Sequence, residues 1–232
     1  MNARLGWILG VSMLLSGIAC GVENSSPPQG GSPKESQKSP EKKEASQPTA
    51  TRYKVNPAKS HMTAQVGVGG MLKSLGHPHL IALREVQGEA ETASQLVGPA
   101  TIHLRFATGS AEETSKEFDE KDRQKVNTAV RQEALETARF PEVVFKSRKV
   151  EVRESGEHLY AAAISGDLTL HGVTHEVSFP AKVSLQGKSL RAEGSFTILH
   201  STYGIKRLSA AGGTIKAKDE IVLSFDIQAD PD

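Results

Sequence analysis

Residues 166–180 read GDLTLHGVTHEVSFP and predict two strands joined by a tight turn at His171-Gly172. Apolar and polar residues alternate on both sides of this turn, which is the period-two pattern of half-buried strands. His171 and His175 are four residues apart, a spacing that would align them on a helix, but Gly172 and the flanking alternation argue against a helix. Zinc needs three or four ligands in fixed geometry. We therefore interpret both histidines as turn residues that satisfy backbone groups.

The same alternation recurs along the chain from Tyr53 onward. Thr101 to Phe106 places Ile102, Leu104 and Phe106 on one face, and the segments 177–185 and 221–227 repeat the pattern. Further strands are expected at 64–68, 143–152, 159–170 and 190–198, separated by glycine-containing turn signals. About eight strands are predicted in total.

One segment, residues 118–141, breaks the strand pattern. Val126, Val130 and Ala134 recur at four-residue spacing among strong helix formers, and Pro141 ends the helix by forcing Phe140 toward extended geometry. A mostly antiparallel sheet with one lateral helix favours a barrel or a sandwich over a parallel fold. An eight-stranded barrel has a lumen that is either packed or able to hold a slender ligand.

The first twenty residues, MNARLGWILGVSMLLSGIAC, predict a lipoprotein signal peptide. Arg4 precedes an apolar run, and residues 17–20 resemble a bacterial lipobox in which Cys20 is lipidated, although Gly17 stands where Leu is usual. The alternative is a secretory peptide cut elsewhere, which would leave a free thiol. We expect an exported bacterial lipoprotein, anchored to a membrane and facing the periplasm or the cell exterior.

Residues 21–51 hold five prolines and six serines, and Val22 is their only long aliphatic side chain. Such a segment cannot bury enough apolar surface to offset its ordering entropy, so it is expected to be a disordered tether. Residues 52–232 then form the folded domain. When the five basic and four acidic residues of the first 51 are subtracted from totals of 28 and 27, the domain carries 23 of each. This neutral balance lacks the electrostatic footprint of nucleic-acid binding.

Several short motifs of the domain resemble the YceI-like family of bacterial periplasmic proteins. They are Ser60-His61 after Tyr53-Lys54-Val55, Phe140-Pro141 with Phe145-Lys146-Ser147, the run from Gly166 to Thr174, Tyr203-Gly204-Ile205, and Lys218-Asp219-Glu220-Ile221. The resemblance covers nearly all of residues 53–230. It implies an all-β fold, an eight-stranded antiparallel lipocalin-like barrel with one lateral α-helix, that carries an apolar, roughly linear ligand such as a polyisoprenoid.

Candidate ligand-binding residues follow from the alternation, and any of them is equally compatible with a simple core position. The apolar candidates for the lumen are Val66, Val68, Ile102, Leu104, Phe106, Phe145, Leu168, Leu170, Phe196, Ile198, Leu223 and Phe225. At the mouth, His77, His79 and Lys206 or Arg207 are candidate partners for an anionic head group. Two histidines are too few for a closed metal site, so His77 and His79 have an alternative role in satisfying loop backbone.

The predicted function is non-enzymatic binding or transport of an isoprenoid or another long-chain lipid. The sequence contains no Gly-x-Ser-x-Gly nucleophile motif, and Cys20 is assigned to the anchor, so no catalytic residue, metal site or cofactor is predicted. A homodimer is possible. Two rival hypotheses stay open: a metal- or haem-related periplasmic module that depends on His77 and His79, and a stress-response surface protein with a packed barrel.

Overall fold

The computed structural model describes residues 50–93 and 96–232, so the predicted signal peptide, Cys20 and nearly all of the tether lie outside the described residues. Its strands are β1 (Thr51–Val55), β2 (His61–Gly69), β3 (His79–Leu83), β4 (Val86–Thr92), β5 (Gly98–Ala107), β6 (Glu112–Glu113), β7 (Glu142–Gly156), β8 (Leu159–Leu170), β9 (Val173–Gln186), β10 (Ser189–Leu199), β11 (Ser209–Ala210) and β12 (Ile215–Pro231). The helix α1 spans Glu120–Ala129 and continues as a π-helical turn over Val130–Ala134. Across the described ranges, no helix has the length and apolar character needed to cross a bilayer.

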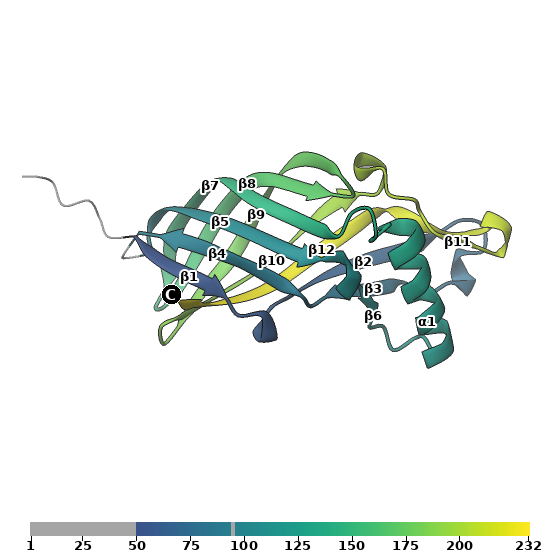
Figure 1. Cartoon of the computed structure of the whole chain (residues 1–232), viewed down its shortest axis with the longest axis horizontal. Helices are drawn as coiled ribbons and strands as arrows, with labels where there is room; N and C mark the ends of the chain where they lie inside the picture. Colours follow the sequence, from purple (N-terminus) through teal and green to yellow (C-terminus); the bar gives the residue numbers. More distant parts are fainter. Residues whose placement is uncertain (1–49, 94–95) are drawn as a thin grey trace, which may run out of the picture. The chain divides into compact units, whose positions relative to one another are not determined.

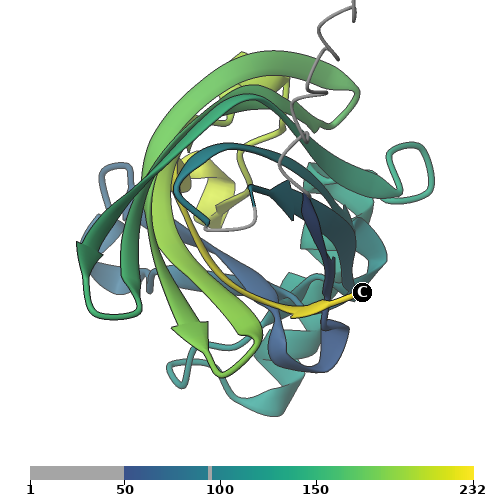
Figure 2. The ribbon, with the colours of Figure 1, turned by 90° about the vertical axis from the view of Figure 1, so that its left-hand side faces the viewer.

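The sheet closes into a barrel (Figures 1 and 2). Its pairing order gives eight strand positions around the barrel. β1 and β2 share one position, because β1 pairs with the end of β12 (Tyr53 opposite Pro231) and β2 with its earlier part (Val66 opposite Ile221). β3 and β4 share the next position, beside β2 and β1, and β5 and β6 share the third. β7, β8, β9, β10 and β12 follow in chain order, and every pairing is antiparallel. The predicted fold is confirmed.

Ser60, a residue of the first motif quoted above, stabilises the chain at the break between β1 and β2. Pro57 lacks an N–H donor, so the strand cannot pair continuously here. Ser60 replaces the missing ladder bonds: its hydroxyl donates to the Gln228 carbonyl (3.1 Å) and accepts from the Gln228 N–H (2.9 Å). The side chain is buried, so these bonds also satisfy a group that water does not reach.

The helix is shorter than the predicted segment 118–141. Asp119 caps its start by accepting a hydrogen bond from the Asp122 amide (2.8 Å), and Val130 and Ala134, two of the residues at four-residue spacing, are buried. Helical structure ends at Ala134, because Glu136 adopts a left-handed backbone conformation (φ 45°) and residues up to Phe140 form turns. The prediction that the helix runs to Pro141 was therefore wrong by about two turns.

The turn at residues 171–172 joins β8 and β9 in a two-residue hairpin. Both His171 (φ 52°) and Gly172 (φ 75°) have positive φ, as a type I′ turn requires. His171 Nε2 lies 2.8 Å from Glu136 Oε2, and His175 Nε2 lies 3.1 Å from the Thr202 carbonyl oxygen. His171 Nδ1 also lies 3.3 Å from the Tyr203 carbonyl oxygen, so both histidines contact backbone carbonyls as predicted, but His175 lies on β9 and not in the turn.

Candidate functional site

An apolar cavity of about 130 Å³ occupies the part of the lumen away from the helix. Seven of the sequence-predicted residues line it: Ile102, Leu104, Phe106, Phe145, Leu168, Phe196 and Phe225. They come from alternating positions on neighbouring strands, because successive side chains of a strand point to opposite faces of the sheet. Nearly all of the exposed cavity wall is carbon, so this space suits hydrocarbon far better than a polar ligand.

Four phenylalanines form one side of this cavity. The Phe179 ring stacks on Phe196 with centroids 4.4 Å apart, and it also contacts Phe145 (5.6 Å) and Phe225 (5.5 Å). Phe179 was not among the predicted site residues, although it lies on the apolar face of 177–185. The alternation of apolar residues was sufficient to identify Phe179 as a candidate. The same pattern was sufficient for Ala162 and Ile164 of β8, which also line the cavity.

A second apolar cavity, of about 100 Å³, lies beside the helix. Val66, Leu170, Ile198, Leu223, His79 and Lys206 line it among the predicted residues. Val126, Val130, Ala134 and Leu135 contribute from the helical segment, which sequence reasoning identified as a helix but did not connect with the lumen. The helical segment therefore forms part of the wall of the second cavity.

Met62 divides the two cavities. Among the described residues it alone lines both cavities, and only 6% of its surface is exposed. Methionine is unbranched and has three rotatable side-chain bonds, so it moves aside more readily than a β-branched residue. The lumen thus holds two cavities that meet at the Met62 side chain, a division that the alternation of apolar residues does not reveal.

An outer groove of about 380 Å³ adjoins the second cavity and is lined by both apolar and charged residues. The groove and the second cavity share His79, Val126, Leu208 and Ala217, so the two spaces are neighbours. Leu75, His77, Phe118, Lys125 and Lys216 also line the groove. Its wall is more polar than that of either cavity, and it is formed by β2, the β2–β3 connection, α1 and the chain between residues 208 and 217.

Two predicted positions differ from the structure. Val68 lines the outer groove and not the lumen, because a shift of register between Ala217 and Ile221 in the β2–β12 pairing carries it beyond the barrel interior. Arg207 is exposed and lines none of these three spaces, whereas the preceding Lys206 lines the second cavity. Lys206 also forms an ion pair with Glu133, with 2.6 Å between Nζ and Oε2.

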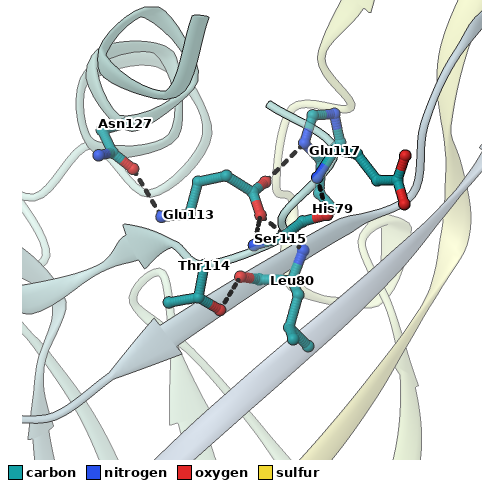
Figure 3. A network of polar contacts seen from close by, with 7 residues as sticks. All are labelled: His79, Leu80, Glu113, Thr114, Ser115, Glu117 and Asn127. Carbon is teal, nitrogen blue, oxygen red and sulfur yellow. Dashed lines mark hydrogen bonds and ion pairs between the residues drawn. The ribbon is translucent and has the colours of Figure 1, made fainter. Parts of the chain in front are cut away.

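His79 is positioned by a buried carboxylate, as Figure 3 shows. Glu113 has no exposed side-chain surface, and its Oε2 lies 2.8 Å from His79 Nδ1. Its Oε1 accepts hydrogen bonds from the amides of Ser115 (2.8 Å) and Leu80 (3.1 Å). Burial by itself would raise the pKa of Glu113, but these hydrogen bonds outweigh it and hold the pKa below the ordinary value. The carboxylate therefore fixes the His79 ring at the boundary of cavity and groove.

His77 and His79 both contact Phe118 and both line the outer groove, so they point to the same side of the chain. His79 stacks on the Phe118 ring with centroids 5.0 Å apart, and His77 meets the ring edge-on at 6.0 Å. His77 Nδ1 lies 3.6 Å from Glu117 Oε2. Within residues 50–93 and 96–232, no three His, Cys, Asp or Glu side chains gather as a potential metal site.

The family model of the YceI-like domain matches residues 53–229. The chain belongs to the YceI-like family. Among solved structures, the YceI-like domain is similar to BcnA of Burkholderia cenocepacia (17% identity, TM-score 0.56), with 75% of this chain and 98% of that one covered. It is also similar to a polyisoprenoid binding domain from Saccharophagus degradans implicated in plant cell wall breakdown (15% identity, TM-score 0.55), with 78% and 98% covered. No curated protein matches this chain. At these identities the two structures establish the fold alone.

Proposed function

We propose that this YceI-like domain binds an isoprenoid or similar apolar chain lipid in its lumen, without covalent chemistry. The observation that carries the proposal is the larger cavity, whose wall is formed by hydrocarbon side chains and exposes almost no polar atoms. A polyisoprenoid is the ligand named for the Saccharophagus relative, which supports the same ligand class here. The proposal also includes anchoring through a lipidated Cys20, on the far side of a Pro/Ser-rich tether.

The energy of such binding comes from apolar surface. Each buried methylene group contributes about 0.8 kcal/mol, so one isoprene unit contributes roughly 3 to 4 kcal/mol before ordering costs. A few units suffice for tight binding, because ordering the chain and fixing lumen side chains offset much of the total. Both cavities are small beside typical ligand pockets of about 300 to 1,000 Å³, so lumen side chains must shift as a long chain enters.

For the polar end of the ligand we propose the boundary between the second cavity and the outer groove. His79 and Lys206 line the second cavity, and His77 lines the adjoining groove. The Nδ1 atom of His79 is hydrogen-bonded to Glu113. No described residue bonds the Nε2 atom of His79, so this atom is available to a polar or anionic head group. Arg207 follows Lys206 in the sequence and adds positive charge outside the wall of the second cavity.

The decisive experiment is to identify what the purified protein carries. The protein is produced in a bacterial host, purified mildly and extracted with organic solvent, and the extract is measured by mass spectrometry. We expect about one chain lipid per barrel. Finding no lipid in the extract, together with no binding of added prenols, would support the rival hypothesis of a packed barrel.

A matched pair of variants connects this lipid with the lumen. Ala162 lines the larger cavity, whereas its neighbour Ala163 is exposed on the outer face of β8. Ala162→Phe fills the cavity and should reduce the bound lipid severalfold, while Ala163→Phe should leave it unchanged. Metal analysis of the same preparations, with and without His77→Ala and His79→Ala, tests the rival metal hypothesis.

A further inference from the structure

The connection between β2 and β3 exposes three large apolar side chains in a row of five residues. Met71 is 90% exposed, Leu75 is 68% exposed and Leu72 is 42% exposed. Single exposed apolar residues are ordinary on a protein surface, but a local group of long ones marks an interaction site. We call residues 71–75 the apolar tip.

The apolar tip is an ordered turn with fixed backbone contacts. The Leu72 amide donates to the Thr214 carbonyl (3.1 Å), and residues Lys73–Leu75 form a turn of 3₁₀ helix closed by the Gly76 amide. Gly70 has a φ of 97° and lies so close to Thr214 that a side chain there would collide with the backbone. The chain therefore holds these apolar side chains outward.

Lysines lie within and beside the apolar tip: Lys73 belongs to it, and Lys216 is opposite Gly69. The segments 67–78 and 200–218 pair through β2 and β12, with Gly69 opposite Lys216, and they contain no Asp or Glu. Their basic residues are Lys73, Lys206, Arg207, Lys216 and Lys218. Two acidic side chains near the groove pair with lysines: Asp122 with Lys125 and Glu133 with Lys206. Among the described residues, Lys73, Lys216 and Lys218 form no ion pair.

From this juxtaposition we propose that the apolar tip docks the barrel on an anionic lipid bilayer. Apolar side chains that enter the interface and basic residues that face anionic head groups are the two components of peripheral membrane binding. A second copy of the domain is a poorer occupant, because two tips packed together would bring their unpaired lysines into repulsion. The docking goes beyond lipid binding in the lumen and does not depend on what the cavities hold.

The apolar tip adjoins the outer groove, so docking also affects how a ligand enters and leaves the lumen. Leu75, Gly76 and His77 line the outer groove, and the groove shares four wall residues with the second cavity. A bilayer that receives the tip thus faces the approach to the lumen that is formed by β2 and α1. A lipid chain that moves between the bilayer and the second cavity through the outer groove crosses only a short distance of water.

The test uses residues 46–232, whose described part forms one compact unit. The sheet of this unit closes on itself, and both of its core clusters consist of residues between Tyr53 and Ala229. Without the first 45 residues, neither Cys20 nor the only tryptophan, Trp7, contributes to the measurement. Binding to phosphatidylglycerol vesicles is measured by co-sedimentation and compared with binding to phosphatidylcholine vesicles. We expect stronger binding to the anionic vesicles, weakened by salt.

Variants then assign the contact to the apolar tip. Combining Met71→Ser, Leu72→Ser and Leu75→Ser should weaken vesicle binding roughly tenfold or more. Leu159→Ser is the matched control, because Leu159 is also exposed (52%) but lies in the β7–β8 hairpin, outside the tip. Lys73→Glu with Lys216→Glu should weaken binding to anionic vesicles and leave the weak binding to phosphatidylcholine unchanged. Thermal unfolding of each variant checks that the exposed substitutions leave the barrel folded.

A fluorescent reporter locates the contact directly. Met71→Trp or Leu159→Trp introduces the only tryptophan of this unit. The emission of the Met71→Trp variant should shift to the blue on phosphatidylglycerol vesicles, and that of the Leu159→Trp variant should not. Equal shifts in both variants, vesicle binding that the serine variants leave unchanged, or no vesicle binding would overturn the proposal. A dimer that the serine variants dissociate, in the absence of vesicle binding, would instead assign the tip to a second copy.

Discussion

Met62 lies opposite Phe225 across the β2–β12 pair, at the boundary between the two lumen cavities. Phe225 lines only the larger cavity, and Leu223, two residues earlier on β12, lines only the smaller one. The boundary therefore crosses the barrel at this level. A ligand short enough for one cavity leaves Met62 in place, whereas a longer ligand must displace its side chain.

Met62→Ala should change the preference for ligand length. Removing the divider joins the two cavities, so the ratio of affinities for solanesol, a long prenol, over geraniol, a short one, should rise. Stability should fall by about 2 to 5 kcal/mol, as is usual when a buried methionine is truncated. Met62→Leu keeps the volume and serves as the control, with a cost below about 1.5 kcal/mol. An unchanged affinity ratio, measured by competition binding, would contradict a dividing role for Met62.

Gly166→Ala should destabilise the barrel, because the glycine marks a close approach of β8 to β7. A Cβ atom at Gly166 would lie 2.7 Å from the Phe145 ring and would also collide with the Lys146 carbonyl oxygen. Crowding of this kind costs roughly 1 to 3 kcal/mol in a packed interior. Gly109→Ala is the control, since nothing lies within 4 Å of its added Cβ. Chemical denaturation of both variants measures the difference, and equal stabilities would refute the steric explanation.

The strand pattern and the barrel were predictable because each strand has one face in the lumen and one in solvent. Ile102, Leu104 and Phe106 show this plainly: they alternate with polar residues, and all three line the larger cavity. The breaks that place eleven strands in eight positions were harder to predict, because Pro57 and Ser60 signal an interruption without indicating which strands share a position.

The parts of the site that depend on distant contacts were not predictable. The division of the lumen at Met62 depends on where β2 passes Phe225, and the position of Val68 depends on a bulge in β12. The environment of His79 depends on Glu113, which is 34 residues away and follows a short 3₁₀ turn. Periodicity gives the face on which a residue lies, but register and bulges decide which residues meet across the barrel.

Lys206→Ala should separate head-group recognition from stability. The ion pair between Lys206 and Glu133 is exposed, with 64% and 52% of the two side chains accessible, so its loss should cost less than about 1 kcal/mol. If Lys206 contacts an anionic head group, the variant should bind geranylgeranyl pyrophosphate roughly tenfold less tightly. Its affinity for the uncharged prenol should not change. Lys182→Ala, an exposed position on β9, is the control. Equal losses for both ligands would exclude head-group recognition by Lys206.

Glu113→Gln should make the protein less stable near neutral pH and remove part of its acid sensitivity. In the folded protein the pKa of Glu113 lies below its ordinary value of about 4.3. A lowered pKa contributes stability that is fully present above the unfolded value and is lost as the pH falls through the folded value. Near pH 7, replacing the buried carboxylate should therefore cost about 1.5 to 3 kcal/mol, because its hydrogen bonds involve a charged group.

The difference between wild type and Glu113→Gln should then shrink as the pH falls below about 4, since the wild-type carboxylate also becomes neutral. Glu117→Gln is the matched control: Glu117 faces His77 across 3.6 Å but is 58% exposed, so its replacement should change stability by less than about 1 kcal/mol at any pH. Urea denaturation of the three proteins between about pH 3 and pH 7 measures both effects. A Glu113→Gln cost that is the same at both ends of this range would mean that the side chain acts through packing and not through its charge.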